Sequence, residues 1–311
     1  MAHLPTRPLG DSGLEVSVVG LGCNNFGRRV DLEGARTVVN AALEQGATFF
    51  DTADIYGGHG GSEEILGELL EGRRDEVVLA TKFGMDMGDG ATRRGSADYI
   101  RHSIAGSLRR LRTDVVDVYW MHQPDLETPI AETLGALDEL VRAGTVRAIG
   151  ASNFSASQIE EADAVARERG FARFCAIQNE YSLLKREAER DVIPTCERLG
   201  LGFVPYFPLA SGLLTGKYHR GEDAPAGSRL SGRARVASDE QFRLLETLER
   251  YTAQRRVLMT TVAIGGLLAR PVISSVIAGA TRPEQVGANV QAARWTPSDA
   301  DIRELDQLLV T

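Results

Sequence analysis

Short apolar runs alternate with helical segments along the whole chain. The runs carry the β-branched and aromatic residues of buried strands, and eight can be read, at residues 14–22, 47–51, 76–82, 114–122, 146–153, 174–179, 202–206 and 272–279. Apolar residues at helical spacing fill the segments between and after them, at residues 32–44, 63–70, 98–111, 130–142, 155–170, 187–199, 239–269 (two helices), 283–291 and 298–309. Eight buried strands that alternate with helices predict an α/β fold, the (β/α)8 TIM barrel. A doubly wound Rossmann sheet alternates in the same way, so the count alone leaves both folds open.

Two further segments complete the predicted fold. A short N-terminal hairpin, with its turn at residues 11–13, precedes the first barrel strand. After the seventh run, residues 207–238 lack strong periodicity, so we expect a long loop, and loops of this length are usually functional. We interpret it as a lid that orders when a cofactor binds. No linker divides the alternation, and 311 residues is an ordinary size for one barrel, so we expect a single domain over residues 1–311.

The composition excludes several classes of function. A net charge of −8 argues against a nucleic-acid partner, because phosphate binding needs clustered Lys and Arg. There is no apolar stretch of about 20 residues for a membrane span and no leader-like start, so we expect a cytoplasmic protein without a membrane partner. Three widely separated cysteines predict no disulfide framework, and no His or Cys spacing suggests a metal. The expected partner is a small molecule, and the expected state is a monomer or a simple homo-oligomer.

Polar side chains of catalytic types stand at the ends of three consecutive runs. Asp51 and Tyr56 follow the second run, Lys82 ends the third, and His122 ends the fourth. The carboxyl ends of barrel strands meet at one face, where barrel enzymes carry out their chemistry. We therefore expect these four side chains to share a site.

These residue types suit the transfer of a proton to a carbonyl oxygen. The ordinary pKa of tyrosine is about 10, so Tyr56 needs a neighbouring cation to stabilise its phenolate. Lys82 is the candidate cation, Asp51 would hold it charged, and His122 would hydrogen-bond the substrate or relay the proton. Hydride must come from a cofactor, because no amino acid supplies one. The site predicts carbonyl reduction with Tyr56 as general acid. An alternative use of Lys82 is as the Schiff-base nucleophile of an aldolase.

The later runs end in groups that suit a nicotinamide. Ser152, Asn153 and Gln178 offer the hydroxyl and amide groups that a carboxamide needs, and Tyr206 offers a flat ring for stacking. A structural barrel would not need such groups at these positions.

The motifs of this chain resemble those of the aldo-keto reductases. The family's order is followed by FDTADIYG, ATKFG, MHQPD, GASNF, IQNEYS, PYFPLASGLLTGKY and AGATRPEQVGANV, from about residue 8 to residue 308. The resemblance implies that Asp51, Tyr56, Lys82 and His122 form the catalytic tetrad of a barrel enzyme. The cofactor contacts predicted with its help are Gly22, Cys23, Asn24, Ser152, Asn153, Gln178, Tyr206, Phe207, Leu209, Ser211, Gly212, Leu213, Lys217, Gly279, Thr281, Arg282, Gln285 and Asn289.

One end of the predicted site should determine which cofactor binds, and the other end should determine which substrate binds. Arg282 near the adenosine phosphate favours NADPH over NADH, because an Arg fork suits a phosphate. The expected walls of the substrate pocket are Asn25, Phe26, Phe83, Met85 and Phe154. Their mixture of aromatic, thioether and amide groups fits a partly apolar or sugar-like carbonyl compound.

The sequence therefore predicts an NADPH-dependent oxidoreductase that reduces aldehydes or ketones to alcohols. Two alternatives use the same site. One is an NAD(P)-dependent sugar or alcohol dehydrogenase that runs the reaction in reverse. The other is a cofactor-binding regulatory module that resembles the β subunits of potassium channels.

Overall fold

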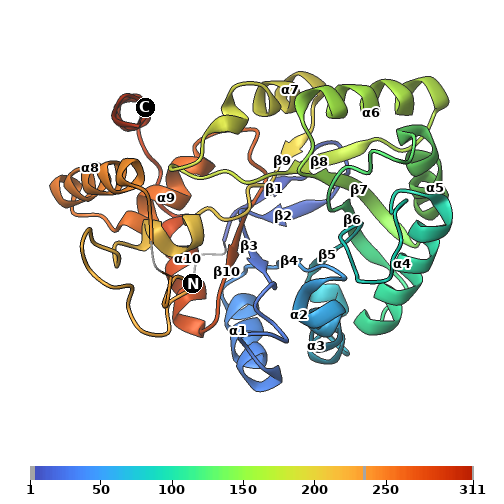
Figure 1. Ribbon diagram of the computed structural model, residues 1–311, viewed down its shortest axis with the longest axis horizontal. Helices are drawn as coiled ribbons and strands as arrows, with labels where there is room; N and C mark the ends of the chain where they lie inside the picture. Colours follow the sequence, from blue (N-terminus) through green and yellow to red (C-terminus); the bar gives the residue numbers. More distant parts are fainter. Residues whose placement is uncertain (1–3, 234–235, 310–311) are drawn as a thin grey trace.

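An eight-stranded parallel sheet forms the centre of the computed structural model, which describes residues 4–233 and 236–309 (Figure 1). Its strands are β3 (Val19–Gly22), β4 (Phe49–Asp51), β5 (Val78–Phe83), β6 (Val116–Met121), β7 (Val146–Ser152), β8 (Phe174–Gln178), β9 (Gly202–Phe203) and β10 (Val276–Gly279). The strand order is β10-β3-β4-β5-β6-β7-β8-β9, so each strand lies beside its chain neighbour and the last lies beside the first. A doubly wound sheet would reverse its order at a switch point. The predicted (β/α)8 barrel is confirmed.

The barrel closes between β9 and β10 through a short seam. Isolated parallel bridges join Phe203 to Ile273 and Tyr206 to Ile277, and the amide of Ile277 donates to the carbonyl of Pro205 at 3.0 Å. We expected a strand over residues 202–206, but β9 has only two residues. Pro205 has no N–H for a ladder, which limits regular pairing here.

A hairpin of β1 (Thr6–Pro8) and β2 (Glu15–Ser17) precedes the barrel, as predicted. The expected run over residues 14–22 is divided between β2 and β3. The Ser17 hydroxyl causes the break, because it accepts from the amides of Thr48 and Phe49 at 3.0 and 3.1 Å and donates to the carbonyl of Val19 at 2.8 Å. The hairpin residues Leu9 and Val16 are fully buried and belong to the apolar cluster that fills the barrel around Trp120. The hairpin therefore helps to close the barrel interior.

Helices surround the sheet on its outer side (Figure 1). They are α1 (Leu32–Glu44), α2 (Tyr56–His59), α3 (Gly61–Leu69), α4 (Ala97–Leu111), α5 (Ile130–Arg142), α6 (Ala156–Arg169), α7 (Val192–Leu199), α8 (Asp239–Arg255), α9 (Met259–Leu268), α10 (Pro283–Ala292) and α11 (Asp299–Leu308). Three 3-10 turns, η1 (Arg74–Glu76), η2 (Glu187–Glu189) and η3 (Ala210–Thr215), complete the described elements. Local signals set the ends of α6, where Ser155 forms a capping box with Gln158 and Gly170 adopts a left-handed conformation. None of the helices in the described part of the chain is long and apolar enough to cross a membrane.

The long loop predicted over residues 207–238 lies between β9 and α8, and we call it the lid. It begins with η3 and then continues without regular structure toward α8, on the left of the molecule in Figure 1. Residues 234 and 235 lie outside the described part. Phe207, Ala210 and Ser211 all have positive φ angles of 46–58°, a conformation that non-glycine residues adopt only when their surroundings impose it. The first turn of the lid is therefore held by its contacts.

Candidate active site

The four predicted catalytic side chains meet at the carboxyl end of the barrel strands. Asp51 is the last residue of β4, Lys82 is the fifth of β5, and His122 directly follows β6. The Nζ atom of Lys82 lies 2.6 Å from Oδ2 of Asp51 and 5.0 Å from the ring centroid of Tyr56. The Tyr56 and His122 rings meet edge to face, with centroids 5.7 Å apart. The structure therefore brings the four residues together at one end of the barrel.

Lys82 is fully buried and its ammonium group is held by several acceptors. Besides Asp51 it donates to the carbonyl of Thr52 at 2.8 Å, and Gln178 donates to the other Asp51 oxygen at 3.0 Å. Burial alone would lower the pKa of Lys82, but the charges and hydrogen bonds of Asp51 and Tyr56 outweigh burial and raise it. Lys82 therefore carries a fixed positive charge at neutral pH.

Tyr56 is the weak acid of the group. Burial raises its pKa above 10, and the opposing effect of Lys82 is not sufficient to reverse this. We expected Lys82 to favour the phenolate; it does so, but the desolvation of the hydroxyl is the larger effect. The phenol is consequently protonated at neutral pH, which is the form that a proton donor needs.

His122 is neutral in the same surroundings. Its burial, with the charge of Lys82 as a second cause, lowers its pKa well below 6.5. Its Nδ1 atom is buried and makes no hydrogen bond to any residue that the structure describes. Because Nδ1 is enclosed by protein, a hydrogen bond between this neutral imidazole and a small molecule has to be made by the other ring nitrogen, Nε2.

The backbone turns sharply after Tyr56. Gly57, Gly58, His59 and Gly60 all have positive φ angles, between 70° and 110°. At Gly57 a Cβ atom would lie 2.5 Å from the amide nitrogen of Ser62 and would clash with it, so only glycine fits. This turn makes up most of α2 and leads through Gly60 into α3.

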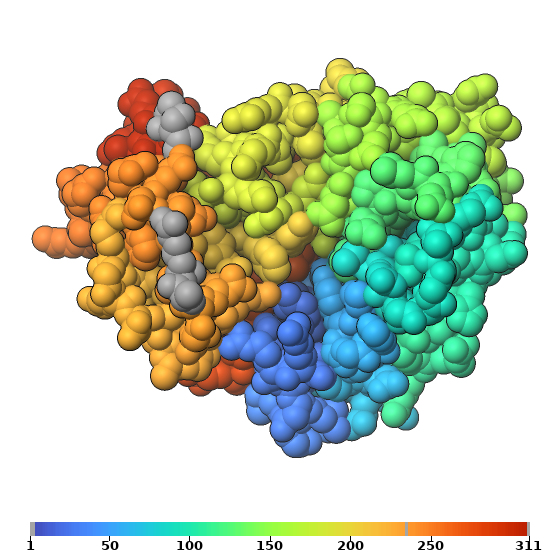
Figure 2. Space-filling view, viewed as in Figure 1, coloured from blue at the N-terminus to red at the C-terminus, as the bar shows by residue number. Residues whose placement is uncertain are grey.

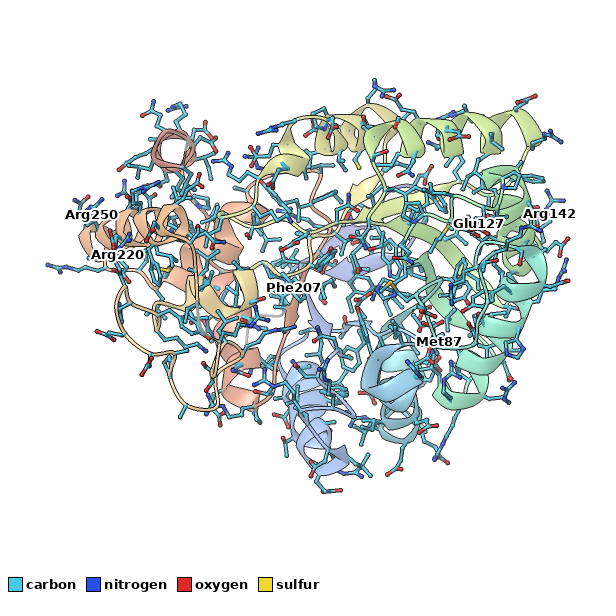
Figure 3. All side chains as sticks on the ribbon, in the orientation of Figure 1. Met87, Glu127, Arg142, Phe207, Arg220 and Arg250 are labelled. Atoms are coloured by element: carbon cyan, nitrogen blue, oxygen red, sulfur yellow. The ribbon has the colours of Figure 1, made fainter. Side chains whose placement is uncertain are left out.

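A cavity of about 760 Å³ opens in front of these residues. Asp51, Tyr56 and His122 line it, whereas Lys82 lies behind them, out of direct contact with the cavity. Figure 2 shows the surface hollowed between the lid and the blue N-terminal segments of the barrel. In Figure 3, Phe207 of the lid lies near the centre of the molecule, and Met87 and Glu127 lie to its right in the same view.

Most of the predicted cofactor contacts line this cavity. The residues that do so are Gly22, Asn24, Ser152, Asn153, Gln178, Tyr206, Phe207, Leu209, Ser211, Gly212, Lys217, Gly279, Thr281, Arg282 and Gln285. Cys23, Leu213 and Asn289 do not line it, because all three side chains are buried in the protein interior. The Cys23 thiol donates to the carbonyl of Leu21 at 3.4 Å. These three predictions of direct contact are corrected by the structure.

Asn153 supports the site through several hydrogen bonds. Its amide group donates to the carbonyl of His122 at 2.9 Å and to Ser152 Oγ at 3.2 Å, and its Oδ1 atom accepts from the Tyr206 hydroxyl at 2.7 Å. Its φ of 62° is one that asparagine tolerates better than most residues. The Asn153 side chain thus orients the Tyr206 ring, while Ser152 and Gln178 line the cavity beside it.

The predicted substrate pocket is only partly correct. Asn25 and Met85 line the cavity, but Phe26, Phe83 and Phe154 are 0–3% exposed and pack in the core instead. Phe83 lies against Tyr119, with centroids 4.8 Å apart, and Phe154 meets Phe174 at 5.7 Å. Successive strand residues point to opposite faces, so Phe83 faces the helices because Lys82 faces the barrel. In their place, the wall includes Gln123, directly after His122.

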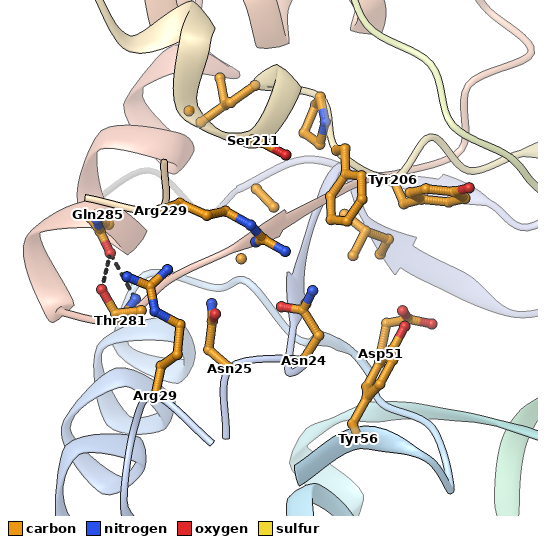
Figure 4. Close-up of a pocket in the computed structure, with 18 of the residues that line it drawn as sticks. Asn24, Asn25, Arg29, Asp51, Tyr56, Tyr206, Ser211, Arg229, Thr281 and Gln285 are labelled. Atoms are coloured by element: carbon orange, nitrogen blue, oxygen red, sulfur yellow. Dashed lines mark hydrogen bonds between the residues drawn. The ribbon is translucent and has the colours of Figure 1, made fainter. Parts of the chain in front are cut away.

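Two further arginines lie on the cavity wall: Arg29 was not among the predicted contacts, whereas Arg229 of the lid was expected, with Lys217, to reach phosphates. Arg29, from the segment after β3, donates to the carbonyl of Gly227 in the lid at 3.2 Å, and Arg229 of the lid lies 4.9 Å from the Phe207 ring centroid. Figure 4 shows both side chains reaching into the cavity near Thr281 and Gln285. Partial desolvation, and then the charges of neighbouring arginines including Arg29, lower the pKa of Arg229. The sequence signals were the paired arginines of GRRV (residues 27–30) and the single arginine of GSRL (residues 227–230) in the lid.

Comparison with known proteins agrees with this geometry. The model of the aldo/keto reductase family matches residues 18–310. The chain belongs to the aldo/keto reductase family. Among its relatives, this aldo-keto reductase is 38% identical over 311 residues to the "uncharacterized oxidoreductase YrpG" of Bacillus subtilis, covering 96% of this chain and 94% of that protein.

Two plant relatives widen the comparison. A "probable voltage-gated potassium channel subunit beta" of Oryza sativa is 36% identical, with 94% of this chain and 92% of that protein covered. A "probable aldo-keto reductase 1" of Glycine max is 32% identical, with 98% and 88% covered. Membership of the family makes this aldo-keto reductase an oxidoreductase of small carbonyl compounds, in a family that uses nicotinamide cofactors.

Proposed function

We propose that this chain is an NADPH-dependent reductase of aldehydes and ketones, in which Tyr56 donates the proton to the carbonyl oxygen. The observation that carries the proposal is the buried Lys82–Asp51 ion pair beside a protonated Tyr56 on the wall of the cavity. A nicotinamide bound in this cavity would supply hydride, which no protein group can supply.

Tyr56 and its neighbours divide the proton chemistry between them. Tyr56 donates its hydroxyl proton as negative charge grows on the carbonyl oxygen. The phenolate left behind is stabilised by the Lys82 ammonium, which Asp51 keeps charged. Neutral His122 provides a nitrogen that can hydrogen-bond the carbonyl oxygen and orient it. Lys82 is fully buried, has an acid partner and does not line the cavity, which argues against the Schiff-base alternative.

The residues of the cavity fit a dinucleotide. Ser152 and Gln178 offer groups for a carboxamide, and Asn153 holds the Tyr206 ring at the same end. At the other end stand four cationic side chains, Arg29, Lys217, Arg229 and Arg282. This gathering of positive charge in a chain of net charge −8 supports a ligand with several phosphate charges, and it favours the extra phosphate of NADPH.

The helix α10 adds to the same end of the cavity. It begins at Pro283 with Arg282 as its N-cap residue, so the positive end of the helix dipole faces the region of Arg282 and Thr281. Gln285 accepts from both the amide and the hydroxyl of Thr281, at 2.7 and 3.1 Å, which fixes this turn (Figure 4).

The role of Tyr56 is tested with the Tyr56→Phe variant, which removes only the hydroxyl group. We expect kcat for an aldehyde to fall about 10²- to 10⁴-fold while NADPH binding is retained. The control is Tyr181→Phe, which removes the buried hydroxyl that donates to Glu189, away from the cavity. If Tyr56→Phe keeps the wild-type kcat, Tyr56 is not the proton donor.

The cofactor preference is tested by fluorescence titration with NADPH and NADH. Arg229→Ala and Arg282→Ala should each weaken NADPH binding far more than NADH binding. Arg28→Ala is the control, because Arg28 is an arginine directly before the cavity residue Arg29 but does not itself line the cavity. Equal losses for both cofactors would move the phosphate site elsewhere.

A regulatory role is the second candidate, because two relatives, from rice and Arabidopsis, are described as potassium-channel β subunits at 36% and 34% identity. It predicts tight NADPH binding without turnover on a panel of aldehydes, ketones and sugars. Turnover of an alcohol with NADP⁺, but of no carbonyl with NADPH, would instead favour the dehydrogenase direction.

A further inference from the structure

A buried carboxyl group that the proposed mechanism does not use lies two residues before Tyr56. Asp54 is 2% exposed, and its Oδ1 atom has no hydrogen-bond partner among the described residues. A carboxylate in such a position is costly unless it is paired or protonated. The burial of the Asp54 carboxyl group with one oxygen unpaired therefore calls for a physical explanation.

A second carboxyl group lies close to Asp54 and takes the nearest cation. Glu63 of α3 is fully buried, and it accepts from the Thr81 hydroxyl at 2.5 Å and from Nε of Arg110 at 2.7 Å. Lys82 is already committed to Asp51. The titratable groups whose charges act on or respond to Asp54 are Glu63 of α3, Arg110 and Tyr99 of α4, Lys82 of β5 and Tyr119 of β6. Two buried carboxyl groups thus share the charge of one guanidinium.

The segment that contains Asp54 carries two of the four proposed catalytic side chains. It is fixed to β5 by hydrogen bonds from the amide of Thr52 to the carbonyl of Ala80, at 2.9 Å, and from the amide of Asp54 to the carbonyl of Lys82, at 3.1 Å. After Tyr56 the chain enters the glycine-rich left-handed turn. The position of Tyr56 therefore depends on the residues that precede it.

We propose that Asp54 is a positioning residue that holds the Tyr56 segment in place as a neutral carboxylic acid, and that loss of its proton displaces Tyr56. The proposal rests on the proposed role of Tyr56 as proton donor. Ionisation would place a second negative charge near Glu63, where the cations that act on Asp54 are Arg110, which is paired with Glu63, and Lys82, which is paired with Asp51. Repulsion between the two carboxylates would then act on the segment that ends at Tyr56.

The electrostatics of the cluster agree with a proton on Asp54. Burial, and then the charge of Glu63, raise the pKa of Asp54 to about 7, against the opposing effects of Arg110 and Lys82. The unfolded chain has an ordinary aspartate pKa of about 3.9. Between these values the folded state binds the proton and the unfolded state does not. The stability that Asp54 contributes is thus fully present below pH ~4 and is lost as the pH rises toward about 7.

The test compares the wild type with Asp54→Asn, a neutral isostere, in two measurements. The first is the pH profile of kcat with saturating NADPH and aldehyde. The wild type should lose activity on the alkaline side with an apparent pKa of about 7, falling about 10-fold one unit above this midpoint. Asp54→Asn should retain its activity through that interval. Asp98→Asn, at an exposed position, is the matched control and should follow the wild type.

The second measurement is the urea midpoint between pH 4 and 8, which needs no turnover. The midpoint of the wild type should fall relative to that of Asp54→Asn as the pH rises, and the difference should level off above about pH 7. When Glu63→Gln is added to both proteins, it removes the charge that raises the pKa of Asp54. The difference between their urea midpoints should then level off at a lower pH. A midpoint difference that does not change with pH overturns the proposal, as does the same alkaline loss of kcat in the wild type and Asp54→Asn. If no carbonyl is turned over, the proposed function fails, while the urea comparison still decides the protonation of Asp54.

Discussion

The Lys82–Asp51 ion pair can be tested as a stabilising interaction, separately from catalysis. Its two charged atoms are 2.6 Å apart and the side chains are at most 4% exposed. At an effective dielectric constant of about 20, Coulomb's law gives an attraction of about 6 kcal/mol at this distance. Desolvation of both ions offsets much of it. Removal of one partner leaves the other charge buried and unpaired, so Asp51→Asn or Lys82→Met should each cost about 3–5 kcal/mol.

The double variant Asp51→Asn/Lys82→Met separates this coupling from ordinary packing effects. It buries no unpaired charge, so its loss of stability should be no greater than that of either single variant. In urea denaturation with an m-value of about 3 kcal/mol/M, each single variant should lower the midpoint by about 1–1.7 M. If the two single losses simply add in the double variant, or if each is below about 1 kcal/mol, the ion pair does not hold this site together.

Three further predictions follow from the core and from burial of charge. Gly150→Ala would place a Cβ atom 2.2 Å from the Trp120 ring and 2.9 Å from the backbone oxygen of Ala176, so thermal unfolding should show a loss of at least about 1–3 kcal/mol, partly relieved by Trp120→Phe; an unchanged melting temperature would contradict the packing described. Arg110→Met should cost about 3–5 kcal/mol, because it leaves the fully buried Glu63 without its guanidinium, and a loss below about 1 kcal/mol in urea would refute this. The pKa of His122 is lowered on folding, so the folded state binds fewer protons than the unfolded chain below about pH 6.5 and stability falls as the pH drops. His122→Gln should reduce that acid sensitivity. If the urea midpoints of the wild type and of His122→Gln shift equally between pH 7.5 and 5, this prediction is wrong.

The strand and helix pattern was predictable because its signals are local. The predicted helices at residues 32–44 and 130–142 have the bounds found for α1 and α5, since apolar spacing and capping residues are properties of short segments. The break at Ser17 was not predicted, because its cause is a side chain that bonds to backbone amides 31 and 32 residues away. Pro205, by contrast, was visible in the sequence as an obstacle to a full-length β9.

The catalytic grouping was predictable for a different reason. Once the fold is a barrel, the carboxyl ends of its strands must meet, so the positions of Asp51, Lys82 and His122 along the chain already place them together. Which side a residue faces is a separate question. Phe83 was assigned to the pocket although it follows Lys82 directly, and alternation along a strand would have excluded it.

The basic end of the cavity needed the structure. Arg29 and Arg229 are 200 residues apart in sequence, and their approach depends on the path of the irregular lid, for which the sequence has no periodic signal. Arg220, another cation of the lid, points to the outer edge of the molecule and pairs with Asp239 and Glu246 (Figure 3). Among the arginines of the lid, the sequence did indicate Arg229 as one able to reach phosphates, whereas Arg29 was not predicted.

The short seam of the barrel links ligand binding to the stability of the fold. Between β9 and β10 the described residues form no regular strand pair: two isolated bridges and a few backbone hydrogen bonds, such as those from the amide of Ser274 to the carbonyl of Phe203 and from the amide of Ile277 to the carbonyl of Pro205, both 3.0 Å, close the ring. The cavity is lined by Tyr206 on one side of that seam and by Ile277 and Gly279 on the other. A molecule that fills the cavity therefore spans the join, and because it binds the closed barrel and not the unfolded chain, it should stabilise the fold by an amount that grows with its concentration relative to its Kd.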